Sequence, residues 1–248
     1  MKRFVFVILL LGMIGFELQA QGFAFGIKGG PTVGFQNWDG SSRDPLFKYH
    51  GILFIESAEE GSPFSLFAQA GYHIKGSAVR YNFRPQCIDG LGNVFDCDFE
   101  TLEYQFRNAS LTLGGKKRFE NNGRNLYYLF GLRGDFTINT NLEDYNNGRV
   151  AYFGGYPLEG FVRKLNYGVT LGGGIEFPIS DLVGAMVELT INPDFSRQYF
   201  QPPIPNVTNP FNGQSYTIPE REIRNVTLEL TVGFRFLRKV IYIDEDDY

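Results

Sequence analysis

The sequence predicts an all-β fold: an eight-stranded, antiparallel, up-and-down transmembrane β-barrel with short periplasmic turns and long extracellular loops. Three observations predict it. Connections between strand-like segments alternate long and short, as in outer-membrane barrels. Several segments alternate apolar and polar residues with the period of two that a strand requires. The chain has 25 Phe and 14 Tyr but a slightly negative mean hydropathy, which suits alternating strands.

The start of the chain has the three parts of a signal peptide. Lys2 and Arg3 supply positive charge, residues 4–16 form an apolar stretch, and residues 18–20 form a cleavage site. The apolar stretch is shorter than the about 20 residues that a helix needs to cross a bilayer. We therefore expect export to the outer membrane of a Gram-negative-type bacterium. The expected signal peptide, outer-membrane β-barrel and acidic periplasmic tail are 1–20, 21–237 and 238–248.

Strands and connections can be placed along the chain. Eight strands are expected between clusters of turn-forming residues: 23–35, 48–58, 64–80, 101–117, 125–139, 161–178, 183–197 and 222–237. Three connections are short and rich in turn formers: 59–63, 118–124 and 179–182. Four are longer and all fall on the opposite side: 36–47, 81–100, 140–160 and 198–221. Eight antiparallel strands place both ends of the barrel on the turn side, the periplasm.

The last strand shows which residues face lipid. Side chains alternate between the two faces of a strand, and the residues predicted to face lipid are Val226, Leu228, Leu230, Val232 and Phe234. A soluble, lipocalin-like barrel would turn such a face inward and cover its exterior with charge. The polar faces hold mainly Gly, Thr, Asn and isolated charges, not the dense Lys and Glu of a soluble exterior. This favours a membrane barrel.

Two strands depart from the simple pattern. In 101–117, Tyr104 and Phe106 fall in one phase and Leu111 in the other, so we expect a bulge or a change of environment near residues 107–108. The strand 48–58 is apolar on both faces, which leaves its inward side ambiguous.

The polar faces predict a lumen filled by side chains. An eight-stranded barrel is just wide enough for its own side chains to fill, and an unpaired charge there would carry a large desolvation cost. Six positive and five negative side chains are expected inside: Lys28, Lys75, Lys116, Arg133, Lys164 and Arg235, with Asp135, Glu176, Glu188, Asp194 and Glu229. This near balance predicts interior ion pairs, whereas a selective pore would show a ring of one sign.

The two cysteines, Cys87 and Cys97, fall in one long loop. An extracellular loop meets oxidising conditions, so we predict a disulfide between them. Two cysteines alone make a poor zinc site, and no metal or other cofactor is expected. The formal net charge of −4 offers no basic excess for nucleic acid.

The sequence does not predict an enzyme. A membrane-barrel hydrolase needs a base near its outer rim, and the chain has two histidines, His50 and His73. His50 follows two serines and two aspartates of the segment 36–47, which permits a Ser-His-Asp arrangement without any motif around it. His73 falls within a strand, where a lumen side chain is the simplest interpretation.

The long loops and the tail are the candidate sites for partners. The loops 140–160 and 198–221 carry several aromatic residues, and the second also carries five prolines. Exposed aromatics mark contact surfaces, but they also form interfacial girdles or a lid, and both interpretations stay open. The tail 238–248 has an apolar segment before four acidic residues. It either docks on a periplasmic partner as an added strand or is a chain end without a role.

Several short blocks resemble the PorT-like outer-membrane β-barrel family. They are GIKGGP, AGYHIKG, YGVTLGGGIEF and GFRF, at 26–31, 70–76, 167–177 and 233–236. The resemblance implies an eight-stranded outer-membrane barrel, and some relatives assist secretion of other proteins. The matching blocks are strand patterns and not site residues, so they specify a scaffold better than a function.

Two classes of function therefore remain. The first is a structural, binding or secretion-accessory barrel, embedded in outer-membrane lipid, that engages a periplasmic or outer-membrane protein through its loops or tail. The alternative is a small conduit or a rim-sited membrane-barrel enzyme.

Overall fold

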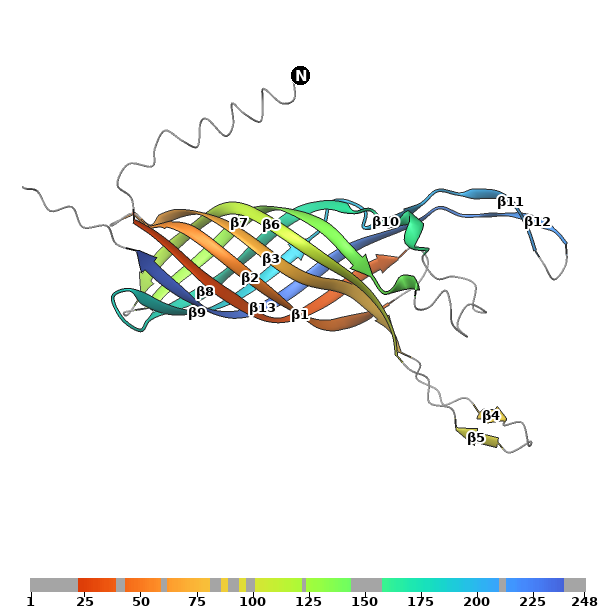
Figure 1. Ribbon diagram of the computed structural model, residues 1–248, viewed down its shortest axis with the longest axis horizontal. Coiled ribbons are helices and arrows are strands. Elements are labelled where there is room, and N and C mark those ends of the chain that lie inside the picture. Colours follow the sequence, from red (N-terminus) through yellow and green to blue (C-terminus); the bar gives the residue numbers. More distant parts are fainter. Residues whose placement is uncertain are drawn as a thin grey trace, which may run out of the picture.

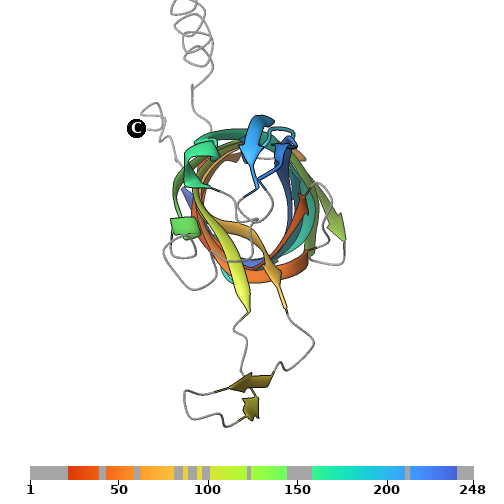
Figure 2. The same ribbon diagram turned by 90° about the vertical axis from the view of Figure 1, so that its right-hand side faces the viewer.

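The computed structural model describes residues 22–38, 43–58, 62–80, 86–88, 94–96, 101–121, 124–143, 158–209 and 213–238. Eight long antiparallel strands form a closed ring (Figures 1 and 2). They are β1 (Gly22–Trp38), β2 (Asp44–Ala58), β3 (Phe64–Val79), β6 (Leu102–Asn121), β7 (Arg124–Thr140), β8 (Leu165–Pro178), β9 (Val183–Pro193) and β13 (Arg221–Arg238). Shorter elements lie at one end of the ring: β4 (Gln86–Ile88), β5 (Val94–Asp96), the 3-10 helix η2 (Glu159–Phe161), β10 (Tyr199–Gln201), β11 (Ile204–Thr208) and β12 (Ser215–Ile218).

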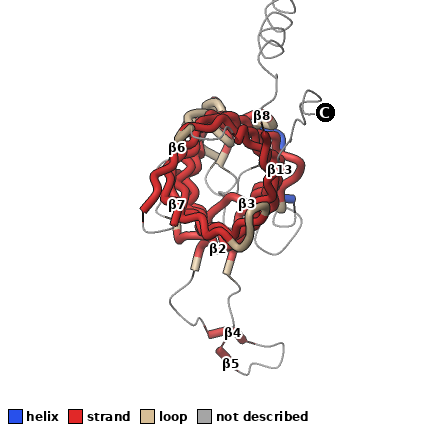
Figure 3. The backbone as a smooth tube through the Cα atoms, turned by 90° about the vertical axis from the view of Figure 1, so that its left-hand side faces the viewer, coloured by secondary structure: helices blue, strands red, loops and turns tan. Residues whose placement is uncertain are grey.

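The ring is closed by its first and last strands. β1 pairs with β13 in a register that runs from Phe23 opposite Arg238 to Trp38 opposite Ile223. Each of the eight strands therefore has a hydrogen-bonded neighbour on both sides, and the backbone trace viewed from the turn end is a circle (Figure 3). Closure is what allows a sheet to cross a membrane, because lipid offers no partner for a free backbone N–H or C=O.

The two faces of the ring differ as a membrane requires. Four inward side chains of β13 are polar and at most 2% exposed: Asn225, Thr227, Glu229 and Thr231. The five residues predicted to face lipid are 37–58% exposed: Val226, Leu228, Leu230, Val232 and Phe234. Outward positions of the other ring strands also carry large exposed apolar side chains, among them Ile27, Leu53 and Leu132. A polar interior under an apolar exterior is the reverse of a soluble barrel and defines a β-barrel of the outer membrane.

The strands are longer than the membrane needs. They contain between 11 residues in β9 and 20 in β6, whereas a tilted strand crosses the hydrocarbon core with about 9–11. Most ring strands therefore continue past the membrane. Within the described residues, no helix is long and apolar enough to cross it.

The predicted eight-stranded barrel is confirmed, but four strand boundaries differ by four residues each. β2 begins at Asp44, earlier than expected. β8 begins at Leu165, because the residues before it form η2 and a single bridge at Val162. β9 ends at Pro193, since proline has no N–H to continue the ladder. β6 runs on to Asn121, through most of the segment expected as a turn.

The irregular strand β6 combines both of the expected causes. Its pairing with β7 shifts between Arg107 and Asn108. Side chains nevertheless keep the same inward and outward alternation along all of β6, because Tyr104, Phe106 and Asn108 are buried while Leu111 is exposed. The change of residue type along β6 thus marks a real change of environment: the interior of the ring becomes apolar toward the loop end.

The predicted loops contain additional structure. The connection 81–100 holds the two-stranded β4–β5 sheet, and the connection 198–221 holds β10, which pairs with β13, and the β11–β12 hairpin. Cys87 lies in β4, but Cys97 lies outside the described residues, as do the signal peptide 1–20 and the tail from residue 239. The disulfide, the cleavage site and the role of the tail stay predictions.

Candidate functional site

The interior of the barrel contains ten of the eleven charged residues that the sequence placed there. They are Lys28, Lys75, Lys116, Arg133, Asp135, Glu176, Glu188, Asp194, Glu229 and the partly buried Arg235. Lys164 is the exception, and its placement in the lumen is wrong. It is exposed, because it precedes the first residue of β8 and so does not take part in the inward alternation of that strand.

Two interior charges were missed. Glu56 sits near the end of β2, whose apolar character on both faces hid its inward phase. Arg118 was assigned to a turn, whereas β6 continues beyond it. The ion-paired set of the interior then consists of six cations and six anions: Lys28, Lys75, Lys116, Arg118, Arg133 and Arg235, with Glu56, Asp135, Glu176, Glu188, Asp194 and Glu229. The formal charge of this set is zero.

A first layer of ion pairs closes the turn end of the ring. Glu56 accepts hydrogen bonds from Lys116 at 2.8 Å, from Arg118 at 2.6 Å and from Arg235. Glu176 pairs with Arg118 at 3.5 Å and with Arg235 at 3.0 Å. Four strands contribute these side chains, so the layer ties the ring together across its diameter.

The next layer is built around Glu188. Lys28 lies 2.6 Å from its carboxylate, and the Tyr127 hydroxyl donates to it at 3.0 Å. Lys116 lies over the Tyr127 ring at 4.2 Å from the centroid. A side chain at Gly174 would lie only 2.6 Å from the Tyr127 hydroxyl, so this glycine makes room for the tyrosine to reach across the lumen.

Both histidines point into the middle of the ring. His73 Nδ1 is 2.7 Å from Glu229, and His50 lies 2.9 Å from the hydroxyls of both Thr32 and Thr231. The two imidazoles stack, with centroids 5.6 Å apart. His50 is therefore an interior side chain of β2 and not a residue of the outer rim.

Toward the loop end, two anions and two cations form a compact cluster. Lys75 contacts Asp135 at 2.7 Å and Asp194 at 2.9 Å. Arg133 contacts the same two carboxylates, Asp135 at 3.0 Å and Asp194 more closely. Asn225 donates to Asp194 at 3.1 Å. Every charge in this buried cluster faces an opposite one, which offsets the cost of removing it from water.

Beyond this cluster, an apolar plug fills the ring. It consists of buried side chains from several elements: Leu102, Tyr104, Phe106, Leu142, Tyr199 and Ile223. Trp38 packs against it, with its ring 5.1 Å from that of Tyr104. Sequence alternation alone did not reveal this plug, because an inward aromatic and a lipid-facing one look alike.

The interior therefore acts chemically as a packed core. The cavity between His73, Arg133 and Glu229 has a volume of about 10 Å³, roughly the space of one water molecule. In the part of the chain that the structure describes, no group of three or more His, Cys, Asp and Glu side chains could hold a metal ion.

The outer surface offers a different kind of site. The β11–β12 hairpin extends past the ring (Figure 1), with Val207 opposite Tyr216 and Thr208 opposite Ser215. Its side chains are largely exposed, and Tyr216 is 48% exposed. The base of the hairpin is anchored, since the guanidinium groups of Arg163 and Arg197 both lie over the ring of Phe200 of β10, at 5.1 and 4.9 Å from its centroid.

Comparisons with known proteins find solved structures that are similar only at low sequence identity. No protein-family model and no curated protein matches the chain. Neisserial surface protein A is 8% identical, with 86% of this chain and 96% of that one covered and a TM-score of 0.44. The outer membrane protein OprG from Pseudomonas aeruginosa is 10% identical, with 89% and 97% covered and a TM-score of 0.49. Ail, the attachment invasion locus protein of Yersinia pestis, is 12% identical, with 87% and 99% covered and a TM-score of 0.37. The assignment to outer-membrane β-barrels rests on the closed ring and its lipid-facing exterior.

Proposed function

We propose that the protein is a non-conducting outer-membrane barrel that acts as a structural and binding component, holding a recognition surface outside the cell. The observation that supports this proposal is the filled interior, where six cations and six anions pair in layers beneath an apolar plug. A selective conduit would need a continuous aqueous path lined by charges of one sign. Balanced, mutually paired charges favour a scaffold.

The binding surface in this proposal is the β11–β12 hairpin. An isolated two-stranded hairpin is marginally stable in water, and within the described residues β11 and β12 pair only with each other. An extended segment of a partner protein would add a third strand and satisfy backbone groups along the hairpin edge. The anchored base around Phe200 would hold the hairpin in place for that contact.

The resemblance to the PorT-like family supports an accessory role, since some of its members assist secretion of other proteins. A second contact through the tail 238–248 in the periplasm is part of the same proposal. Catalysis is not part of this proposal. His50 is hydrogen-bonded to Thr32 and Thr231 inside the ring, whereas a hydrolase would need its histidine at the rim.

Conductance measurements test the closed lumen. Wild-type protein in planar bilayers should give no stepwise ion current in concentrated KCl, with a porin inserted in the same way as the positive control. Discrete, reproducible current steps from the wild type would refute the scaffold and favour the conduit.

Photo-crosslinking in intact cells tests the binding surface. A benzoylphenylalanine at position 216 should give a discrete protein adduct. The same group at Phe195, which is exposed outside the hairpin, should not. Absence of an adduct at 216, or the same adduct at both positions, would contradict the assignment of the hairpin.

A further inference from the structure

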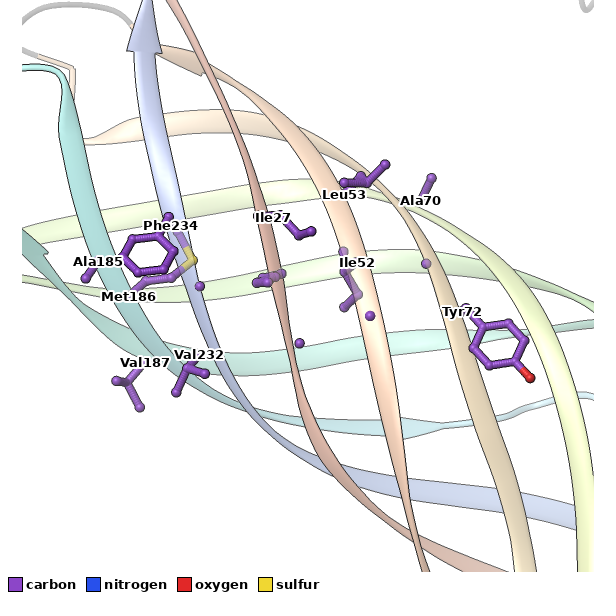
Figure 4. Close-up of a pocket in the computed structure, with 15 residues that line it drawn as sticks. Ile27, Ile52, Leu53, Ala70, Tyr72, Ala185, Met186, Val187, Val232 and Phe234 are labelled. Atoms are coloured by element: carbon purple, nitrogen blue, oxygen red, sulfur yellow. The ribbon is translucent and has the colours of Figure 1, made fainter.

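The lipid-facing wall of the barrel has a hollow that crosses five neighbouring strands, β9, β13, β1, β2 and β3. In one row across the wall, Gly29 of β1 lies opposite Val232 of β13 and opposite Gly51 of β2, and Gly51 lies opposite Tyr72 of β3. Two adjacent glycines thus replace outward side chains. The space above them measures about 830 Å³, with Tyr72 at one end and Val187 at the other (Figure 4).

The hollow arises because Gly29 and Gly51 have no side chains. The barrel requires a glycine at only one of these two positions. A Cβ at Gly29 would lie 2.8 Å from the His50 carbonyl oxygen, so a glycine is required there. A Cβ at Gly51 would meet nothing within 4 Å, and the backbone of Gly51 does not have a positive φ. A large side chain at Gly51 would therefore fit without disturbing the strand. Among the residues that the structure describes, packing gives no reason for a glycine at this position.

The hollow lies deep in the membrane. Gly51 is the central residue of β2, which spans Asp44–Ala58. Exposed apolar side chains continue along the same strand on both sides of it, Tyr49 and Phe47 toward the loops, Leu53 and Ile55 toward the turns. At this depth the surroundings are hydrocarbon, and the surface of the hollow is almost entirely apolar.

We propose that the hollow is a binding groove for one acyl chain of a membrane phospholipid. The groove is continuous with the lipid-facing belt, so chains reach it without leaving the bilayer. An unfilled hollow forfeits the dispersion contacts of its walls, and a thin, flexible hydrocarbon chain can restore them. This inference concerns the wall of the barrel and is independent of the function proposed for the hairpin.

A second copy of the chain fits the groove less well. The outer wall of a barrel is convex, so the wall of a neighbouring copy would rest on the side chains around the groove, such as Ile27 and Leu53, without reaching its glycine floor.

A matched pair of variants tests the groove. Gly51→Leu fills it. Gly134→Leu makes the same change on the outward face of β7, where an added Cβ also meets nothing within 4 Å. Each protein is folded into palmitoyl-oleoyl phosphatidylglycerol vesicles that contain a small fraction of phosphatidylcholine with a diazirine in mid-chain, then illuminated, and its adducts are mapped by mass spectrometry. Heat-modifiable migration on gels verifies that all three proteins are folded.

In the wild type and in Gly134→Leu, adducts should concentrate on the β1, β2 and β3 segments around the groove. In Gly51→Leu their yield should fall by about fivefold or more, equivalent to about 1 kcal/mol of binding. Adducts spread evenly around the ring, or a pattern that Gly51→Leu leaves unchanged, would overturn the proposal. So would protein–protein crosslinks that Gly51→Leu removes, since the occupant would then be a second copy.

Discussion

The Lys28–Glu188 ion pair allows a quantitative test of the packed lumen. Both side chains are 2% exposed and their charged atoms are 2.6 Å apart. At an effective dielectric constant of about 20, this distance corresponds to an attraction of about 6 kcal/mol, which offsets a desolvation cost of several kcal/mol for each ion. Lys28→Met or Glu188→Gln alone leaves the other charge buried without its partner. Each should lower the free energy of unfolding by about 3–5 kcal/mol.

The double variant should recover most of this loss, because it removes both charges while the amide oxygen introduced by Glu188→Gln can still accept the hydrogen bond of Tyr127. We expect it to lie within about 1 kcal/mol of the wild type, which gives a coupling energy well above about 2 kcal/mol. The assay is urea unfolding in lipid vesicles, followed by the fluorescence of Trp38, the only tryptophan of the chain. Trp38 packs on the apolar plug and so reports on an intact interior.

The pair of Lys48 and Glu103 is the matched control. Its charged atoms are 2.7 Å apart, but the side chains are 22% and 33% exposed. The same cycle there should give a coupling of at most about 1 kcal/mol, because solvent screens the pair. If Lys28→Met and Glu188→Gln are additive, or if the control couples as strongly, the lumen is wet and its charges are not a packed core.

Three further predictions concern the wall, the loop and the tail. Leu230→Arg, in the middle of the lipid-facing face of β13, should destabilise the barrel in bilayers by about 2–4 kcal/mol, and Phe236→Arg near the end of that strand by only about 0–1 kcal/mol; equal losses would mean that β13 does not face lipid as described. Alkylation and mass analysis of the unreduced protein should find Cys87 and Cys97 joined, closing a loop worth about 2–3 kcal/mol in the chain-entropy picture, and two labelled thiols would exclude the disulfide. Deleting residues 240–248 should preserve heat-modifiable folding while removing co-purifying periplasmic protein; a failure to fold would place the tail within the barrel.

Strand periodicity predicted the ring well because lipid and lumen impose opposite chemistry on alternate residues. Periodicity failed to show which side chains point inward where the lumen-facing and the lipid-facing residues are both apolar. In β2, Ile52 and Phe54 are buried inside while Leu53 and Ile55 face lipid, so both faces look alike and the inward phase of Glu56 could not be read. The apolar plug around Phe106 escaped prediction for the same reason.

Errors at strand ends had a different origin. Whether a charge enters the lumen depends on where pairing stops, and this is set by neighbouring strands. Lys164 is excluded because β8 starts one residue later, and Arg118 is included because β6 pairs with β7 as far as Asn121. The hairpin in the proline-rich loop also depends on pairing between β11 and β12, across residues that composition alone marks as a turn region.

The balance of charge inside the barrel has a consequence for function. When six cations and six anions pair around a central cavity that has room for about one water, changes there alter stability before they alter any contact with a partner. Lys28→Met should therefore weaken the barrel in urea and leave the adduct at position 216 unchanged. Replacing residues 203–219 by a short linker should do the reverse, since the hairpin lies outside the ring. If Lys28→Met abolishes the adduct in protein that remains folded, interior and hairpin are coupled, and the barrel transmits a signal across the membrane as well as anchoring a surface.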